Sequence, residues 1–125
     1  MIIAIGCDIV DHEITKKLGW LASPKSVNRV LCDKEKELFN TNKTARFISG
    51  RFAVKEAVLK CLGTGMRDGI SLTDIQVLQT EAGKPTLDIY GEVKTIAQTM
   101  GIANWHVSIS HTGRTSVAFV IAESS

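Results

Sequence analysis

Residues 43–65 read KTARFISGRFAVKEAVLKCLGTG, and this stretch predicts the longest helix of the chain. Asn42 is a suitable N-cap, so the helix is expected to run from about Lys43 to Leu62. Gly63 supplies the left-handed backbone conformation that commonly ends a helix. Apolar side chains recur at spacings of three and four residues and form a broad stripe: Ile48, Phe52, Val54, Val58, Leu59 and Leu62. Such a stripe is typical of a central helix that packs on a sheet.

A second face of this helix is charged at both ends and small in the middle, with Arg46, Ser49, Ala53, Glu56 and Lys60. Arg46 lies roughly 15 Å before Glu56, because the helix rises about 1.5 Å per residue. This face is long enough for an extended anionic ligand, with a metal ion at Glu56 and a remote anion near Arg46. Spacing alone favours a simpler interpretation, a solvated ion pair between Glu56 and Lys60.

The first strand is expected at residues 2–10, an apolar run that Asp8 interrupts. We interpret this run as a buried strand, in which a carboxylate is costly unless a cation meets it. A metal ion shared with Glu56 would be such a cation. Taken by itself, Asp8 is equally suited to capping a turn at the end of the strand.

The remaining segments predict short helices and antiparallel strands, an order typical of an α+β fold with an antiparallel-rich sheet packed on the long central helix. The predicted elements are a helix that starts at Pro24 with Ser23 as N-cap, a short turn capped by Asp33 that carries Leu38 and Phe39, strands at 75–79 and 85–90, a helix at 92–100, and strands at 105–111 and 117–121.

Two local patterns suggest other chemistry. Ser110 beside His111 invites a serine nucleophile, but strict alternation places Ser108 and Ser110 on one strand face and His111 on the other, and no G-x-S-x-G elbow is present. The glycines at 63 and 65 resemble a phosphate loop, but they follow a helix instead of preceding one and lack the P-loop lysine pattern. A helix C-cap is the better interpretation.

Length and composition limit the number of domains and the class of protein. A chain of 125 residues with 44% hydrophobic residues is long enough for one domain, expected to span residues 1–125, and too short for two. The formal net charge of +2 gives no argument for nucleic acid or membrane binding. Widely spaced Cys7, Cys32 and Cys61 fit a reducing cytoplasm, and the N-terminal run lacks the features of a signal peptide or membrane span.

Four segments carry the most specific patterns of the chain: residues 5–10 (IGCDIV), 50–65 (GRFAVKEAVLKCLGTG), 83–85 (GKP) and 107–111 (VSISH). Together they resemble holo-acyl-carrier-protein synthases, the short bacterial 4'-phosphopantetheinyl transferases. They occur in the family's order and at family-like spacing, so the resemblance covers the whole chain. The segment at 50–65 is highly specific, whereas the other three would be weak alone.

The resemblance implies an enzyme of lipid metabolism that supports fatty acid biosynthesis. It would transfer 4'-phosphopantetheine from coenzyme A to a serine of apo-acyl carrier protein and release adenosine 3',5'-bisphosphate. Mg²⁺ would be the metal, with Mn²⁺ as an alternative ion, and Asp8 and Glu56 would be its ligands. Glu56, directly or through a metal-bound water, would accept the serine proton, and Lys60 would stabilise charge on the leaving phosphate.

The resemblance also implies binding and assembly. Arg46, Arg51 and His111 would hold the adenine-nucleotide end with its 3'-phosphate, and the expected pocket-wall positions are Gly63, Gly65, Lys84 and Pro85. The family forms trimers with the active site between subunits. The family usually places an arginine soon after the first-strand aspartate to grip the acidic carrier, but Glu13 and Ile14 stand there in this chain. We expect carrier docking to shift to nearby basic residues: Lys16, Lys17, Lys25 and Arg29.

Two other classes of protein fit the sequence less well. A non-catalytic module that binds coenzyme A or a nucleotide needs the anion-binding residues but not both carboxylates, so Asp8 and Glu56 together count against it. A small RNA-binding domain needs exposed aromatic residues within a basic patch. Aromatic residues make up only 6% of this chain, which weakens that alternative.

Overall fold

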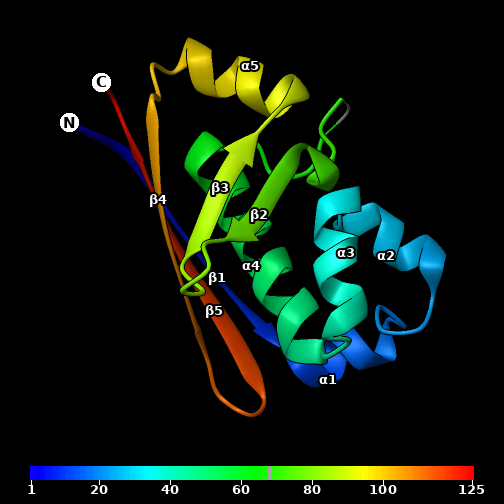
Figure 1. Ribbon diagram of the computed structural model, residues 1–125. Coiled ribbons are helices and arrows are strands. Elements are labelled where there is room, and N and C mark those ends of the chain that lie inside the picture. The colour runs from blue at the N-terminus through cyan, green and yellow to red at the C-terminus, as the bar shows by residue number, and fades with distance from the viewer. Residues whose placement is uncertain (68) are drawn as a thin grey trace.

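A main sheet and a long helix form the centre of the protein. The computed structural model describes residues 1–67 and 69–125, and Figure 1 shows its arrangement. The elements in chain order are β1 (Ile2–Asp11), α1 (His12–Lys17), α2 (Pro24–Val30), α3 (Asp33–Thr41), α4 (Ala45–Leu62), a 3₁₀ helix (Leu72–Asp74), β2 (Ile75–Gln79), β3 (Pro85–Ile89), α5 (Gly91–Thr99), β4 (Asn104–His111) and β5 (Thr115–Glu123). The predicted α+β fold class is confirmed.

The main sheet is antiparallel with the strand order β1-β5-β4, and α4 packs against one of its faces. The outer strands pair with β5 throughout, so Ile2 lies opposite Glu123 and both termini sit side by side (Figure 1). The strands predicted at 75–79 and 85–90 are also present and form a hairpin, the separate two-stranded sheet β2-β3, with Val77 opposite Leu87. The hairpin lies beside α4 and α5, and α1 to α3 cover the other side of α4 (Figure 1).

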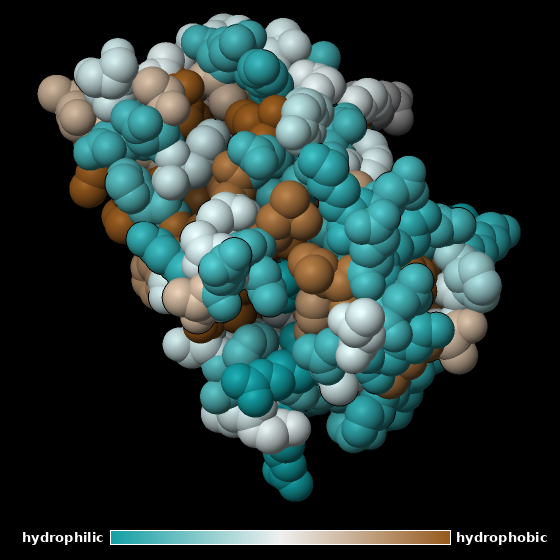
Figure 2. All heavy atoms as spheres, in the orientation of Figure 1, coloured by the Kyte–Doolittle hydropathy of each residue, from teal (hydrophilic) through white to brown (hydrophobic). Residues whose placement is uncertain are grey.

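The interpretation of the first strand as buried is wrong for one of its faces. Gly6 and Val10 are buried against the helix side, but Ile5 is 58% exposed and Ile9 is 68% exposed. Alternate residues of a strand point to opposite faces, and no element of the described chain covers the outer face of this sheet. Figure 2 shows hydrophobic atoms along the left margin of the molecule, beside the main sheet.

Helix α4 begins later than the sequence suggests. Asn42 ends α3 by donating its backbone N–H to Phe39 O, and Thr44 takes the N-cap position, where its hydroxyl accepts from Phe47 N at 3.1 Å. The predicted end is confirmed: Gly63 adopts φ 73° and its N–H donates to Leu59 O. A cap preference applies equally to Asn and Thr, so local sequence does not separate these two starts.

The sequence predictions for the other helices agree with the structure only in part. The helix at Pro24 is confirmed, with the Ser23 hydroxyl accepting from Ser26 N. Asp33 is not a cap of a short turn but the first residue of the nine-residue helix α3, because Cys32 holds the N-cap position and its N–H is satisfied by Glu35. Helix α1 was not predicted. Its Asp11 N-cap accepts from Glu13 N, a signal that the acidic sequence around it does contain.

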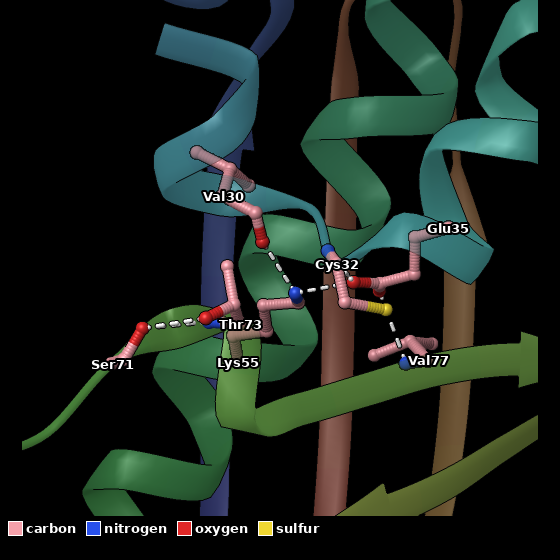
Figure 3. Close-up of polar contacts among 7 residues, drawn as sticks. All are labelled: Val30, Cys32, Glu35, Lys55, Ser71, Thr73 and Val77. Carbon is pink, nitrogen blue, oxygen red and sulfur yellow. Dashed lines mark hydrogen bonds and ion pairs between the residues drawn. The ribbon is translucent and has the colours of Figure 1, made fainter. Parts of the chain in front are cut away.

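A buried ion pair connects α4 to its neighbours (Figure 3). Lys55 and Glu35 are both 0% exposed, and Lys55 Nζ lies 2.7 Å from Glu35 Oε1. Glu35 also accepts from Cys32 N at 2.9 Å and from Val77 N at 3.0 Å, while Lys55 donates to Val30 O. Burial lowers the pKa of Lys55, and Glu35 opposes that shift. The pair therefore fixes α3, β2 and the end of α2 on α4.

Candidate active site

A strand and a helix bring two carboxylates and an ammonium together. Gly6 permits this approach, because a Cβ there would overlap the carbonyl of Ala57 in α4. Asp8, next along the inner face of β1, has a side chain that is 17% exposed. Lys60 reaches from the last turn of α4 and places Nζ 3.1 Å from Asp8 Oδ1 and 2.8 Å from Cys7 O. Lys60 thus pairs across to β1, not along the helix with Glu56 as its spacing alone favoured.

Glu56 belongs to the same group of charges. Its pKa is raised, first by partial burial and then by the negative charge of Asp8, while Lys60 opposes the rise. Two neighbouring carboxylates repel each other, so a cation near both of them lowers the free energy of the charged pair. We call Asp8, Glu56 and Lys60 the carboxylate cluster.

The carboxylate cluster is an incomplete metal shell. Within residues 1–67 and 69–125, no group of three or more His, Cys, Asp and Glu side chains is placed to hold a metal ion. Mg²⁺ is commonly bound by one or two carboxylates together with waters and substrate phosphates. Asp8 and Glu56 fit that donor set, and they lack the nitrogen and sulfur ligands that zinc sites usually contain.

A second cluster lies toward the start of α4. Arg46, Arg51 and His111 line a cavity of about 310 Å³, which we call the cationic cavity. Its other lining residues are Leu38, Thr41, Asn42, Phe47 and Gln79. Because α4 supplies Arg46 and Arg51 at one end and Glu56 and Lys60 at the other, a single helix connects the cationic cavity with the carboxylate cluster.

Arg51 is held rigidly in the cationic cavity. Its guanidinium lies 3.8 Å from the centre of the Phe47 ring, and Nη2 donates to Gln79 Oε1 at 3.1 Å. Its Nε is buried and has no hydrogen-bond partner within the described residues. Burial lowers the pKa of Arg51, although an arginine remains charged at neutral pH. A buried cation with a free donor favours an anionic ligand at this position.

His111 completes the cationic cavity from the end of β4. Its Nδ1 lies 2.7 Å from Ser116 Oγ, and its ring passes so close to α4 that a Cβ on Gly50 would lie 3.0 Å from Cε1. Burial lowers the pKa of His111, and the charges of Arg46, His12 and Arg51 lower it further. The predicted strand faces are confirmed, since Ser108 and Ser110 are exposed on the outer face and His111 is half-buried on the inner one.

The remaining predicted binding residues lie at the borders of these clusters. Gly63 and Gly65 follow α4 just beyond Lys60, and both have positive φ angles. Lys84 is exposed in the β2-β3 turn, and Pro85 pairs with Gln79, the partner of Arg51. The structure places none of these four residues in the lining of the cationic cavity.

Sequence reasoning missed several residues that shape the site. Gly50 stands in the interior of a helix, where glycine costs about 0.5–1 kcal/mol relative to alanine, so it was a usable signal of a close approach. Phe47 and Gln79 gave no such signal, because their contacts with Arg51 depend on how the hairpin packs on α4.

Comparisons with known proteins agree with this architecture. Residues 4–120 match the family model of the 4'-phosphopantetheinyl transferase superfamily. A holo-[acyl-carrier-protein] synthase of Hydrogenovibrio crunogenus is 38% identical over 125 residues, covering 99% of this chain and 98% of that protein.

Solved structures extend the agreement to the fold. A Bacillus anthracis holo-(acyl-carrier-protein) synthase in complex with CoA (3',5'-ADP) has a TM-score of 0.83 at 34% identity, covering 100% of this chain and 99% of that one. The Neisseria meningitidis holo-[acyl-carrier-protein] synthase has a TM-score of 0.88 at 31% identity, covering 98% and 99%. Among the described residues, every helix is too short or too polar to span a bilayer.

The family match over residues 4–120 and the 38% identical relative show that the chain belongs to the 4'-phosphopantetheinyl transferase superfamily.

Proposed function

We propose that this protein transfers 4'-phosphopantetheine from coenzyme A to a serine hydroxyl of apo-acyl carrier protein, in support of fatty acid biosynthesis. The observation that carries the proposal is the placement of the carboxylate cluster and the cationic cavity on one helix. Coenzyme A has the matching charges, a pyrophosphate in the middle and a 3'-phosphate at the adenosine end. Adenosine 3',5'-bisphosphate is the leaving group.

In the carboxylate cluster, Asp8 and Glu56 would hold Mg²⁺, with Mn²⁺ as an alternative ion. A bound divalent ion supplies neutralisation of charge on the pyrophosphate oxygens. The pKa of Glu56 is raised by burial and by Asp8, which makes its carboxylate a better proton acceptor than an ordinary surface glutamate. Glu56, directly or through a water, is the proposed base for the carrier serine.

Lys60 is proposed to act on the leaving group. The serine oxygen forms a bond to the phosphorus that carries pantetheine, and the bond from that phosphorus to the bridging oxygen breaks, leaving its electron pair on adenosine 3',5'-bisphosphate. The contacts that hold the Lys60 ammonium between Asp8 and the Cys7 carbonyl support this role, because a fixed ammonium can stabilise developing negative charge. The nucleophile belongs to the partner protein.

The cationic cavity is proposed to hold the 3'-phosphate. Arg46 and Arg51 supply two permanent charges and His111 supplies a third donor. The buried, unpaired Nε of Arg51 within the described chain adds a donor that a phosphate oxygen would satisfy. Gly63 and Gly65, beyond Lys60, and Lys84 and Pro85, beside Gln79, are proposed as walls of the coenzyme A site.

The protein is proposed to act as a homotrimer with active sites between subunits. The outer face of the main sheet exposes large apolar side chains, including Ile5, Ile9 and Phe119, the last 51% exposed. Adjacent apolar side chains on the paired strands β1 and β5 are typical of a surface that another protein covers. Each copy of residues 1–125 is proposed to form one transferase domain.

The proposed location is the cytoplasm. Cys7, Cys32 and Cys61 are all free thiols, which is the usual state in a reducing compartment. Acyl carrier protein and coenzyme A are the proposed partners there.

Mass spectrometry of the carrier tests the proposal directly. We expect apo-acyl carrier protein incubated with this protein, coenzyme A and Mg²⁺ to gain the mass of one phosphopantetheine group, and to gain none when EDTA replaces the metal. A carrier mass that stays unchanged with metal present would contradict the transferase assignment. The same experiment separates the enzyme from a module that only binds coenzyme A.

A further inference from the structure

Two imidazoles meet at one hydroxyl behind the cationic cavity. Ser116 Oγ in β5 lies 2.8 Å from His12 Nε2 and 2.7 Å from His111 Nδ1. Ser116 is 0% exposed and His12 is 5% exposed, so bulk water has little access to this chain of hydrogen bonds. His12 begins α1 and is not among the residues that line the cationic cavity.

Neighbouring contacts hold the three side chains in register. The backbone N–H of His12 donates to Arg114 O at 2.8 Å, which fixes the start of α1 to the turn before β5. The buried Thr15 and Ser49 hydroxyls lie 2.6 Å apart and fix α1 to α4. On the other side, Gly50 leaves the space that the His111 ring occupies.

One hydroxyl between two imidazoles makes their proton positions dependent on each other. A serine hydroxyl has a single hydrogen, so when it donates to one imidazole it must accept from the other. If His12 Nε2–H donates to Ser116, the hydroxyl donates to His111 Nδ1, and a neutral His111 then carries its proton on Nε2. The reverse order puts the proton on Nδ1 and leaves Nε2 as an acceptor.

The surroundings of His111 favour the first order. Arg46 and Arg51 line the same cavity and prepare it for an anion, to which Nε2–H would donate and which a lone pair on Nε2 would repel. Charging His111 is the alternative way to obtain a donor. Burial opposes that charge, and so do the three cationic or titratable groups that face the ring, namely Arg46, His12 and Arg51, which together lower its pKa.

We propose that His12 is a positioning residue of the anion site: it donates through Ser116 and holds His111 in the neutral tautomer that offers Nε2–H to a phosphate. The inference rests on the proposed function for the identity of that phosphate, the 3'-phosphate of coenzyme A. His12 itself touches no substrate. It sets the direction of the hydrogen bonds at His111, which would contact the phosphate.

Nitrogen NMR of the ligand-free protein tests the tautomer. At a pH where His111 is neutral, we expect its protonated nitrogen to be Nε2 in the parent and the Nδ1 form to gain population in His12→Leu. His106, which bonds to Glu123 on the exposed sheet face, provides an unperturbed reference in the same spectra. A parent protein whose His111 carries its proton on Nδ1 would overturn the proposal.

Binding of adenosine 3',5'-bisphosphate, measured by calorimetry, tests the consequence. His12→Leu should bind about fivefold more weakly, the effect of losing one well-placed hydrogen bond. His12→Gln, which keeps an N–H donor, should recover most of that loss. The Michaelis constant for coenzyme A should rise in His12→Leu, while kcat at saturating coenzyme A stays near that of the parent. Equal binding by His12→Leu and the parent, or equally weak binding by His12→Gln and His12→Leu, would refute the role.

Ser116→Ala keeps the test decisive if His12→Leu does not fold. It removes the shared hydroxyl, leaves both imidazoles, and should reproduce the shift in tautomer and the weaker binding. Unchanged tautomer and binding in Ser116→Ala would overturn the proposal. Failure of the proposed function would give a different result, a parent protein that does not modify the carrier. The spectra and the binding measurement do not depend on transfer, so they test the role of His12 separately.

Discussion

At the scale of single residues, the sequence pointed to the charges of the site but not to all of their partners. Asp8 and Lys60 meet, with 3.1 Å between Nζ and Oδ1, a contact that the sequence did not predict. The ion pair that spacing alone favoured, Glu56 with Lys60, gave way to a contact across two elements. Helical periodicity describes neighbours on one helix, whereas a packed strand offers partners that periodicity cannot predict.

Neutralising either carboxylate should abolish most of the transfer. Asp8→Asn and Glu56→Gln nearly preserve side-chain volume but remove a charged ligand, so we expect kcat to fall at least about 100-fold in each, the usual scale for loss of an acid–base or electrostatic group. Steady-state kinetics with the carrier checks this. A variant that keeps near-parental turnover would place the metal elsewhere.

The same Glu56→Gln protein should be more stable than the parent in metal-free buffer at neutral pH. The folded state raises the pKa of Glu56, so it holds that proton more tightly than the unfolded chain, and stability falls as pH rises from the ordinary glutamate value through the raised one. Glutamine does not ionise and escapes that loss. Thermal melting with EDTA should show a higher Tm near pH 7 and a smaller difference near pH 4.

Lys60→Ala separates a catalytic role from an ion pair at the surface. The Lys60 side chain is 55% exposed, so its pairing with Asp8 contributes little to stability. An ammonium that acts on developing charge should instead affect kcat more than the Kd for coenzyme A. Single-turnover rates and calorimetry give the two numbers. Unchanged turnover with only a small shift in Tm would reduce Lys60 to a structural residue.

At the scale of elements, the sequence predicted the order and type of most helices and strands, but it did not predict how they pack against one another. Alternation in β4 and the glycine after α4 were correctly interpreted because each depends on local geometry. The exposed face of β1 was mistaken for core, because an apolar run does not reveal whether anything covers both faces of its strand. Glu35 and Lys55 lie 20 residues apart, and only the packing of α3 on α4 reveals that they pair.

Breaking the buried pair should lower the free energy of unfolding more than removing a charge at the surface does. Lys55→Met leaves the Glu35 charge buried, so we expect a loss of about 3–5 kcal/mol in the free energy of unfolding. Urea denaturation measures it. Lys36→Met is the matched control, because Lys36 pairs with the 97% exposed side chain of Asp33, and such pairs contribute about 0–1 kcal/mol. Similar losses in both variants would mean that Lys55 does not form a buried ion pair with Glu35.

Adding a second substitution should not restore Lys55→Met fully. Glu35 accepts backbone N–H bonds from Cys32 and Val77 as well as from the lysine. An apolar replacement of Glu35 would leave those two donors unsatisfied, which costs about 1–3 kcal/mol for each group. Glu35→Gln retains an acceptor and should recover more stability in the Lys55→Met background than Glu35→Leu does.

At the scale of the whole molecule, two surfaces remain for other proteins. One is the apolar outer face of the main sheet, which the proposed trimer would cover. Ile9→Glu places a charge where Ile9 is 68% exposed in one copy. In a trimer that contact becomes buried, so sedimentation velocity should show smaller species for Ile9→Glu than for the parent. Identical sedimentation would place the subunit contact elsewhere.

The other surface is basic and lies on the first two helices. Lys16 and Lys17 lie in α1, where Lys16 forms an ion pair with Glu13 at 3.3 Å. Lys25 and Arg29 are exposed in α2. Ile14 is 56% exposed where the family usually has an arginine, so α1 lacks one expected cation for an acidic carrier. Free charges on α2 are the better candidates to replace it.

Reversing the two charges on α2 should therefore weaken carrier recognition selectively. We expect Lys25→Glu combined with Arg29→Glu to raise the Michaelis constant for the carrier severalfold and to leave that for coenzyme A unchanged, because the proposed coenzyme A residues lie on α4 and at the end of β4. The difference should shrink as salt shortens the Debye length to about 8 Å at physiological ionic strength. Equal carrier kinetics for this variant and the parent at low salt would direct the search to Lys16 and Lys17.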